Sequence, residues 1–198
     1  QEREDLASAE GIEPAGLAGV LDAAAAASVA RLAGASPRSI AQGLAAYTVA
    51  GHRGAVIHEH SGISFIDNSK ATNPHAADAA LKGLNSVVWI AGGQLKGAEV
   101  DGLVAKHAAQ IKAAVVLGAD RQEIAQALAE HAPHAPVDVI ESNDPAAAMN
   151  AAVDAALQHA EAGDTVLLAP AAASLDMYTG MAQRGDVFAA AAQELTRN

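Results

Sequence analysis

The sequence predicts an α/β protein built on a doubly wound, mostly parallel sheet. Short apolar segments typical of buried strands recur along the chain, and segments of ten or more residues with helical features separate them. Connections of that length imply parallel strands joined by right-handed crossovers. One further segment, residues 55–67, alternates around Ser61-Gly62, which predicts a hairpin at an antiparallel edge.

A short helical segment precedes this sheet. Residues 20–33 are rich in alanine, a strong helix former. Ser36-Pro37 favours the start of a second helix, which we expect to reach about Tyr47. The pattern then changes, which predicts a boundary between a helical segment over residues 1–50 and an α/β domain over residues 51–198. The chain begins with glutamine rather than methionine, which suggests a cut or processed piece.

Turn and cap residues delimit the elements of the α/β domain. In the hairpin, Val56, Ile63 and Phe65 are expected to point inward. Asp120 and Glu123 have the spacing of a capping box at the start of a helix. We expect strands over residues 86–91, 113–117, 137–140 and 165–168, and helices from Pro74 to about Gly83, over 100–109, up to His131, from Pro145 to about Gly163, and over 186–196.

Composition limits the classes of function. The net charge of −11 argues against a general binder of nucleic-acid phosphates, and the 3% of aromatic residues against a stacking platform for bases or sugars. Without cysteine the chain has no thiol nucleophile, disulfide or thiolate metal site. No apolar run has the length of a membrane span, and nothing at the start is typical of a signal peptide. We therefore expect a cytoplasmic protein with no nucleic-acid or membrane partner.

Three polar segments directly follow predicted strands: residues 67–73, 92–97 and 170–176. In an open parallel sheet, ligands bind outside the carboxyl ends of the strands. The segments supply two lysines, Lys70 and Lys96, together with hydroxyl groups and glycine-exposed backbone amides. Such donors suit a carboxylate or a phosphate, helped by the positive ends of helix dipoles. We therefore predict a site for a small anionic substrate at this edge.

Each of these features also has an ordinary structural explanation. A loop lysine is usually a solvated charge, Gly92-Gly93 can be a tight turn, and Ser69 and Asn73 can be helix caps. Their joint placement at one edge is what favours a functional site.

The other candidates are weaker. His58 and His60 flank Glu59 on a strand without a third metal ligand nearby, so we expect surface residues rather than a metal site. His131 and His134 flank a loop with proline and are expected to be solvated. The sequence has no phosphate loop, no glycine fingerprint for dinucleotides and no hydrolase nucleophile elbow. If the chain acts on ATP, most of the contacts with the nucleotide must therefore come from elsewhere.

Several motifs together are similar to those of one enzyme family. They are His52-Arg53, Asp67-Asn68-Ser69-Lys70-Ala71-Thr72-Asn73-Pro74, Gly92-Gly93-x-x-Lys96, Leu168-Ala169-Pro170-Ala171-Ala172-Ala173-Ser174-Leu175-Asp176 and Gln183-Arg184-Gly185-Asp186-x-Phe188. In order and spacing they closely resemble the MurD family, the UDP-N-acetylmuramoyl-L-alanine:D-glutamate ligases of peptidoglycan synthesis. The resemblance covers residues 50–198 well and residues 1–49 more loosely.

The resemblance implies one part of a larger protein. The family has a UDP-sugar domain, a central ATPase domain and a C-terminal, Rossmann-like domain that holds D-glutamate. Residues 1–50 would be a helical remnant of the central domain and residues 51–198 the C-terminal domain, so truncation would explain the missing phosphate loop. ATP and Mg²⁺ would bind mainly to domains absent from this chain, which alone is expected to be inactive. The implied partners are D-glutamate, UDP-N-acetylmuramoyl-L-alanine and the missing domains.

The resemblance also implies a reaction. In such enzymes ATP converts the substrate carboxylate to an acyl phosphate, and the glutamate amine attacks it to form an amide. Lys70 would be the catalytic residue, near the carboxylate and the reacting phosphoryl group. By resemblance, the substrate site comprises Thr72, Lys96, Ser174, Leu175 and Met181. Met181 stands where the family often has an aromatic residue, and its backbone amide could still serve.

Nucleotide contacts are assigned by resemblance to Arg53, Asp67 and Asn68. Arg53 would lean onto the ATP phosphates. The family usually has aspartate directly before Ser-Lys, against the ribose; here Asn68 is in that place and Asp67 lies one residue earlier. Asparagine can still hydrogen-bond a hydroxyl. The family's His-Asn-x-x-Asn segment, which helps to hold adenine, is not visible around residues 16–22.

A second function also fits the sequence. The chain could be a non-enzymatic α/β module that binds a small anion or a partner and has lost the chemistry, since it carries no ATPase motif. A Mur-type ligase that adds a different amino acid fits less well, because its loop would need donors other than those of Ser-Lys-Ala-Thr-Asn.

Overall fold

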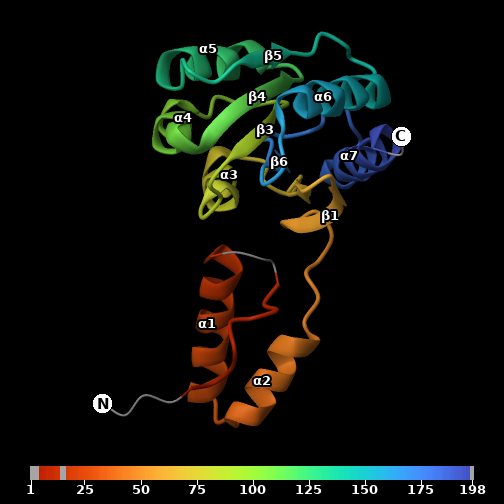
Figure 1. Ribbon diagram of the computed structural model, residues 1–198. Coiled ribbons are helices and arrows are strands. Elements are labelled where there is room, and N and C mark those ends of the chain that lie inside the picture. Colours follow the sequence, from red (N-terminus) through yellow and green to blue (C-terminus); the bar gives the residue numbers. More distant parts are fainter. Residues whose placement is uncertain (1–4, 14–16, 197–198) are drawn as a thin grey trace. The chain divides into compact units, whose positions relative to one another are not determined.

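The computed structural model describes residues 5–13 and 17–196 of the chain. They divide into two compact units, a helical unit over Gln1–Ala50 and an α/β unit over Gly51–Asn198 (Figure 1). No helix within the two described ranges has both the length and the apolar composition needed to cross a lipid bilayer.

The helical unit contains α1 (Leu17–Leu32) and α2 (Pro37–Ala46). Both helices were predicted, although α1 begins earlier than residue 20. Ser36 is the N-cap of α2, because its hydroxyl accepts a hydrogen bond from the Ser39 N–H. In the described part of this unit, Ala27 and Ile40 are the buried apolar residues. The helical unit therefore has little core of its own there.

One six-stranded sheet forms the α/β unit, with the strand order β1-β2-β6-β3-β4-β5. The β1–β2 hairpin is antiparallel and lies at one edge, whereas all other neighbouring strands are parallel. The predicted fold class is therefore confirmed. The strands are β1 (Ala55–His60), β2 (Ile63–Asp67), β3 (Val87–Gly92), β4 (Ile111–Leu117), β5 (Val137–Val139) and β6 (Thr165–Leu168).

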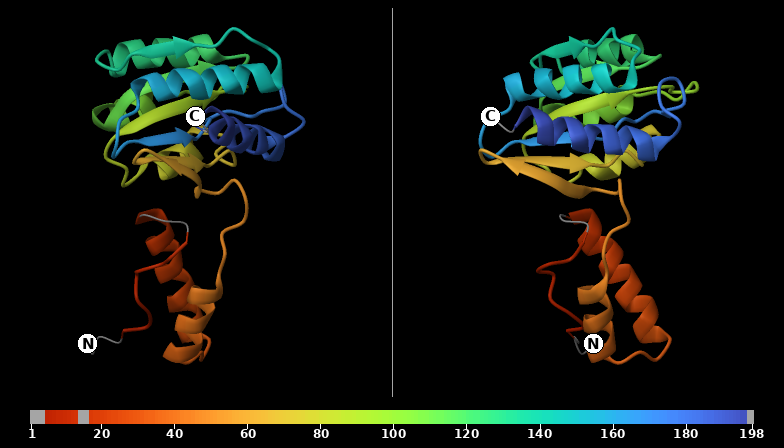
Figure 2. Two further views of the ribbon diagram at one scale, coloured as in Figure 1. Left: turned by 45° about the vertical axis from the view of Figure 1, so that its right-hand side comes forward. Right: turned by 90° about the vertical axis from the view of Figure 1, so that its right-hand side faces the viewer.

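Helices cover both faces of this sheet (Figure 2). One face packs against α3 (Pro74–Leu81), α4 (Asp101–His107) and α5 (Arg121–His131), and the other against α6 (Pro145–His159) and α7 (Met181–Leu195). Alternate side chains of β3 enter the two cores: Trp89 joins the first, and Val88 and Ile90 join the second. A short 3₁₀ helix, Ala108–Gln110, follows α4.

In the hairpin, one predicted inward residue is wrong. Ile63 and Phe65 are buried, but Val56 is 46% exposed. The strand register shifts between Val56 and His58, so Ile57 packs against the core in place of Val56. An extra residue of this kind moves the following side chains to the opposite face of the strand.

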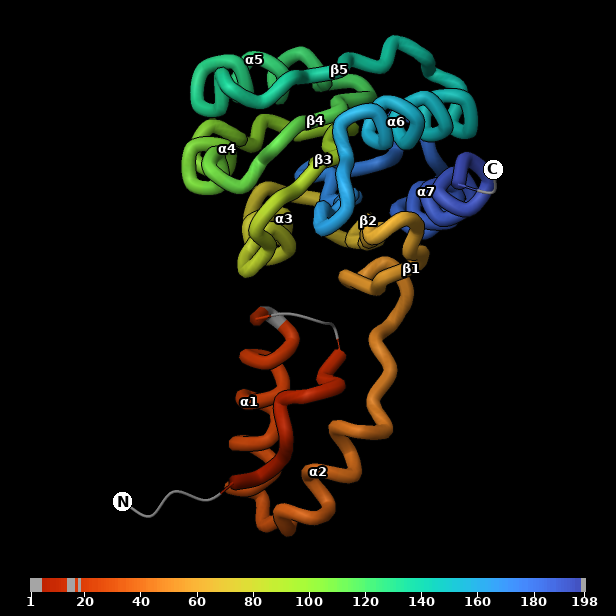
Figure 3. Tube along the Cα trace, in the orientation of Figure 1, coloured from red at the N-terminus to blue at the C-terminus, as the bar shows by residue number. Residues whose placement is uncertain are grey.

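The expectation that His58 is a free surface residue is also wrong. Its ring centroid lies 5.7 Å from that of Phe65, and its Nε2 lies 2.7 Å from the Thr196 hydroxyl just beyond α7. Figure 3 shows α7 beside the hairpin. His131 is likewise not simply solvated, because its Nε2 lies 3.1 Å from the Asp101 carboxylate.

Two helix starts differ from prediction. Asp120 precedes α5 but makes no side-chain cap, so the predicted capping box is wrong; its carboxylate is used by another loop. The last helix begins at Met181 rather than at residue 186 and continues through Gly185. Glycine is needed at this position inside α7, because a Cβ there would overlap the ring of His52.

α3 and α4 are joined by ion pairs around one carboxylate. Asp78 lies 2.6 Å from Lys106 Nζ, 2.7 Å from His107 Nε2 and 3.6 Å from Lys82 Nζ. The hydrogen bond from Lys106 is the main reason why the pKa of Asp78 falls from 3.8 to about 2. The folded state therefore favours the ionised carboxylate.

A pH dependence of stability follows from this lowered pKa. The stabilisation is fully present above the unfolded-state pKa of 3.8 and is lost as the pH falls through about 2. We expect Asp78→Asn to lower the free energy of unfolding at pH 6, and its difference from the wild type to shrink between pH 4 and pH 2. Urea unfolding at several pH values checks this, and a difference that stays constant across the range contradicts it.

Candidate functional site

The carboxyl ends of three neighbouring strands, β2, β6 and β3, bring together the three polar segments singled out in the sequence. Backbone hydrogen bonds join the loops that follow these strands. The Asn68 N–H donates to the Leu168 carbonyl over 2.8 Å, and the Gly92 N–H donates to the Pro170 carbonyl over 2.9 Å. Gln94 and Ala173 exchange two backbone bonds of 2.8 and 2.9 Å. The three loops therefore form one surface.

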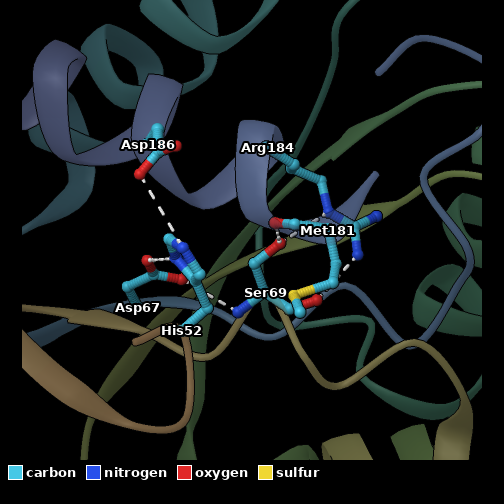
Figure 4. A network of polar contacts seen from close by, with 6 residues as sticks. All are labelled: His52, Asp67, Ser69, Met181, Arg184 and Asp186. Carbon is cyan, nitrogen blue, oxygen red and sulfur yellow. Dashed lines mark hydrogen bonds and ion pairs between the residues drawn. The ribbon is translucent and has the colours of Figure 1, made fainter. Parts of the chain in front are cut away.

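One buried guanidinium, that of Arg184, ties these loops together; Figure 4 shows its contact with Ser69. Arg184, on α7, is 2% exposed. Its Nε donates to the Ser69 hydroxyl over 3.0 Å and its Nη2 to the Ser69 carbonyl over 2.9 Å. Its Nη1 donates to the carbonyls of Gly92 and Ala172 over 3.2 and 3.1 Å. Each loop thus places a carbonyl on the same side chain.

Arg184 keeps its charge in this environment. Burial lowers its pKa from 12.5 to about 10, while nearby acidic groups act in the opposite direction. The guanidinium therefore stays protonated near neutral pH. A hydrogen bond from a charged donor is roughly twice as strong as a neutral one, so the four bonds hold the loops firmly.

The second loop needs glycine at two positions because other backbone approaches it closely. Gly92 and Gly93 have φ values of 131° and 126°. A Cβ at Gly92 would overlap the Leu117 carbonyl, and one at Gly93 would overlap the Ala173 carbonyl. Lys96, at the end of the loop, also has a positive φ of 56°. A left-handed conformation costs a non-glycine residue roughly 1 kcal/mol or more, so the surrounding structure must hold it.

The side chains predicted to bind the ligand form no hydrogen bonds or ion pairs with the described part of the chain. Lys70 and Lys96 are exposed, Thr72 is half-buried, and Ser174 is buried at 3% exposure. Within the described ranges, none of these four side chains has a hydrogen-bond or ion-pair partner. Four donors with positive charge or hydroxyl groups therefore remain available at an edge whose backbone is fixed.

Of the other residues assigned by resemblance, some have exposed or half-buried side chains and others already form hydrogen bonds within the fold. Arg53 is exposed, Asn68 is half-buried and Leu175 is 64% exposed. Met181 is half-buried and its carbonyl accepts a 2.7 Å hydrogen bond from the Ser69 hydroxyl. Asp67 is 1% exposed, with one oxygen bound to the Ser69 N–H at 2.9 Å and the other to His52 at 2.6 Å.

A comparison with known protein families identifies the α/β unit. Residues 52–172 match the family described as Mur ligase, glutamate ligase domain. The chain belongs to this family. The match confirms the family resemblance that the motifs predicted.

Curated relatives of this Mur ligase domain agree. The chain is 64% identical over 186 residues to the UDP-N-acetylmuramoylalanine–D-glutamate ligase of Corynebacterium efficiens and 58% identical over 186 residues to that of Corynebacterium diphtheriae. Each alignment covers 94% of this chain but 39% of the relative. The chain thus spans about two fifths of the length of these relatives.

A solved structure of similar fold is the UDP-N-acetylmuramate-alanine ligase MurC from Thermotoga maritima. The TM-score is 0.61 with 14% sequence identity, over 93% of this chain and 40% of that one. At this identity the likeness supports the fold only.

Arg184 belongs to one of the sequence motifs, but the motif did not predict its role. A signal for its burial was present: Arg184 lies four residues before Phe188, on the stripe of α7 that also buries Ala191 and Ala192. An arginine that is buried on an apolar helical stripe needs hydrogen-bond acceptors from the structure around it.

Asp120 was also missed as a support of the second loop. Its carboxylate accepts a 2.6 Å hydrogen bond from the Leu95 N–H, and its own N–H donates to the Gly93 carbonyl over 2.9 Å. Asp176 similarly accepts a 2.8 Å bond from the Ala119 N–H. In sequence, Asp120 has the pattern of a helix cap, so no signal distinguished this role.

One further group of side chains could offer ligands to a metal ion. Asp101, Glu130 and His131 place oxygen and nitrogen atoms within 4.8 Å of one another, and both carboxylates are exposed. Exposed acidic groups are common on protein surfaces, and no other feature here indicates a ligand.

Removing the Arg184 guanidinium should destabilise the α/β unit strongly. Arg184→Met leaves the buried carbonyls of Ser69, Gly92 and Ala172 without a donor, so we expect a loss of at least about 3 kcal/mol in the free energy of unfolding. Arg121→Met is the matched control, since that side chain donates to one carbonyl, that of Gly118, and pairs with the exposed Glu141; it should cost no more than about 1.5 kcal/mol. Urea unfolding of both variants provides the comparison, and equal losses would refute the clamp.

Proposed function

We propose that this chain is the C-terminal, D-glutamate-binding part of an ATP-dependent ligase that joins D-glutamate to UDP-N-acetylmuramoyl-L-alanine in peptidoglycan precursor synthesis. The observation that carries the proposal is a set of donors on three loops tied together by Arg184, donors that have no partner among the described residues, in a member of the glutamate ligase domain family. The names of the relatives support the same activity.

The donor set fits a dicarboxylate. D-glutamate carries two carboxylates, and we assign them to Thr72, Lys96 and Ser174, which lie one on each loop. Charge-assisted hydrogen bonds to fixed donors would orient the molecule as well as bind it. A dianion held at both ends presents its amine in one direction, and such orientation supplies much of the rate in a reaction between two substrates.

The chemistry proceeds through an acyl phosphate in this proposal. The deprotonated amine of glutamate attacks the carbonyl carbon of the acyl phosphate. The amide C–N bond forms as the C–O bond to the phosphate breaks, inorganic phosphate leaves, and the nitrogen releases one proton. Lys70 is assigned to the carboxylate and phosphoryl region, where its exposed ammonium can offset negative charge as it develops. Leu175 and Met181 belong to the same substrate site, with Met181 acting through its backbone.

Nucleotide contacts are assigned to Arg53 and Asn68. Arg53 is exposed and therefore able to reach phosphate oxygens. Both oxygens of Asp67 already accept hydrogen bonds inside the fold, which favours Asn68 over Asp67 as the group that meets the ribose. ATP and Mg²⁺ would otherwise be bound by a preceding ATPase domain, of which residues 1–50 form the end. A cytoplasmic location follows from this substrate set.

The alternative is a non-enzymatic module that binds a small anion. The same donors would bind the anion, but no amide would be made. A fused protein distinguishes the two: this chain replaces the matching 39% of the Corynebacterium efficiens relative, and ATP-dependent amide formation is measured with D-glutamate.

Direct binding can be measured on the chain alone. In a titration followed by amide NMR signals, millimolar D-glutamate should shift Thr72, Lys96 and Ser174, because these residues meet its carboxylates. Lys82, on the far side of the first loop's helix, serves as an internal reference. If neither D- nor L-glutamate moves any of the three signals, the isolated chain has no intact pocket.

Catalysis in the fused protein should depend on Lys96. Lys96→Ala removes a charge-assisted hydrogen bond of roughly 1.5–3 kcal/mol, so kcat/KM for D-glutamate should fall by about one to two orders of magnitude. Lys82→Ala, which removes a half-exposed lysine 3.6 Å from Asp78 at the end of α3, is the matched control. Full activity of the Lys96 variant would contradict the assignment.

A further inference from the structure

The first turn of the α/β unit carries a histidine that the fold locks in place. The His52 ring lies between β2 and α7, with 18% of its side chain exposed (Figure 4). Its Nδ1 lies 2.6 Å from a carboxylate oxygen of Asp67, and its Nε2 lies 3.7 Å from one of Asp186. Because an ionised carboxylate only accepts hydrogen bonds, Nδ1 is the donor to Asp67.

Two neighbouring features exist to admit this ring. Gly185 is a poor helix former that lies inside α7. A Cβ at this position would overlap His52 Nδ1 and lie 2.6 Å from the Asp67 carboxylate. His52 itself has a left-handed φ of 64°. Glycine in a helix costs roughly 1 kcal/mol relative to alanine, and the positive φ adds a further cost. The fold thus accepts two local penalties at one point.

The backbone around His52 joins the residues assigned to phosphate. The His52 carbonyl accepts a 3.0 Å hydrogen bond from the Lys70 N–H, and the Gly54 N–H donates to the Asp67 carbonyl over 2.8 Å. Arg53 therefore stands between two fixed bonds to the Asp67–Lys70 segment. The ring of His52 secures the same segment through Asp67, whose other oxygen accepts from the Ser69 N–H.

We propose that His52 is a positioning residue, whose ring, hydrogen-bonded to Asp67 and packed against Gly185 of α7, fixes Arg53 and Lys70 relative to each other. This inference rests on the proposed function, which assigns both cations to the phosphoryl region. His52 does not touch substrate in this account. It acts through the turn that carries Arg53 and through the carbonyl beneath Lys70.

The consequence for catalysis concerns geometry rather than charge. Arg53 and Lys70 are exposed, long side chains without partners in the described ranges, so their backbones must supply the order. A misplacement of about 1 Å at a reacting centre can cost on the order of 100-fold in rate. Two of the three assigned D-glutamate donors, Lys96 and Ser174, lie on the other loops, which Arg184 holds. Within the described ranges His52 makes no hydrogen bond to those loops, so KM for D-glutamate should change much less than KM for ATP.

Three variants separate the ring from the backbone. His52→Ala removes the ring, and His52→Gly removes the ring while relieving the positive φ. Gly185→Ala keeps His52 but displaces it, and the change improves the intrinsic propensity of α7. His134→Ala, at an exposed position in the loop before β5, is the matched control.

The first measurement uses this chain alone and does not depend on the proposed function. Amide hydrogen exchange should be at least tenfold faster at Lys70 in all three variants, while exchange at Gln94 and Ala173 and the control variant stay as in the wild type. Restoration of wild-type exchange by His52→Gly would show that only the backbone conformation matters, and would overturn the proposal.

The second measurement uses the fused protein. We expect kcat to fall on the order of 100-fold and KM for ATP to rise in the three variants, with a much smaller change in KM for D-glutamate. Equal changes in both KM values, or wild-type kinetics, would overturn the positioning role. An inactive wild-type fusion would instead count against the proposed function, and the exchange measurement would still decide the role of His52.

Discussion

The buried Arg184 guanidinium is the interaction on which the rest of the site depends. It lies beneath the edge where β2, β6 and β3 end, and donates to carbonyls of all three following loops. Loops that leave parallel strands have no regular partner for their backbone groups, and buried carbonyls without donors are costly. One planar cation with five N–H groups meets that need at three places together.

The site separates supporting groups from binding groups. The supporting side chains form hydrogen bonds with the backbone or with other side chains of the site; they are His52, Asp67, Asp120 and Arg184. Lys70, Thr72, Lys96 and Ser174 stand on the same loops without partners in the part of the chain that the structure describes. Groups that build the loops therefore do not compete with groups that are free to bind an anion. This division supports the proposal that the site binds a small dicarboxylate.

Much of this arrangement could be predicted from the sequence. The strand and helix pattern predicted the doubly wound sheet, and the cap at Asn73 forms as its residue type suggests. Ser69 is not a cap, since its hydroxyl lies between Arg184 and the Met181 carbonyl. Contacts such as these, and that of Gly185 with His52, join residues more than 100 positions apart, and local patterns carry no information on them.

The claim that Arg184 makes one unit of the three loops can be tested most directly by hydrogen exchange in Arg184→Met. The account predicts that the amides of Asn68, Gln94 and Ala173, one from each loop, lose protection together by a similar factor, while amides within β3 and β6 keep theirs. Loss of protection in the Ser69 loop alone, or an equal loss throughout the sheet, would contradict it.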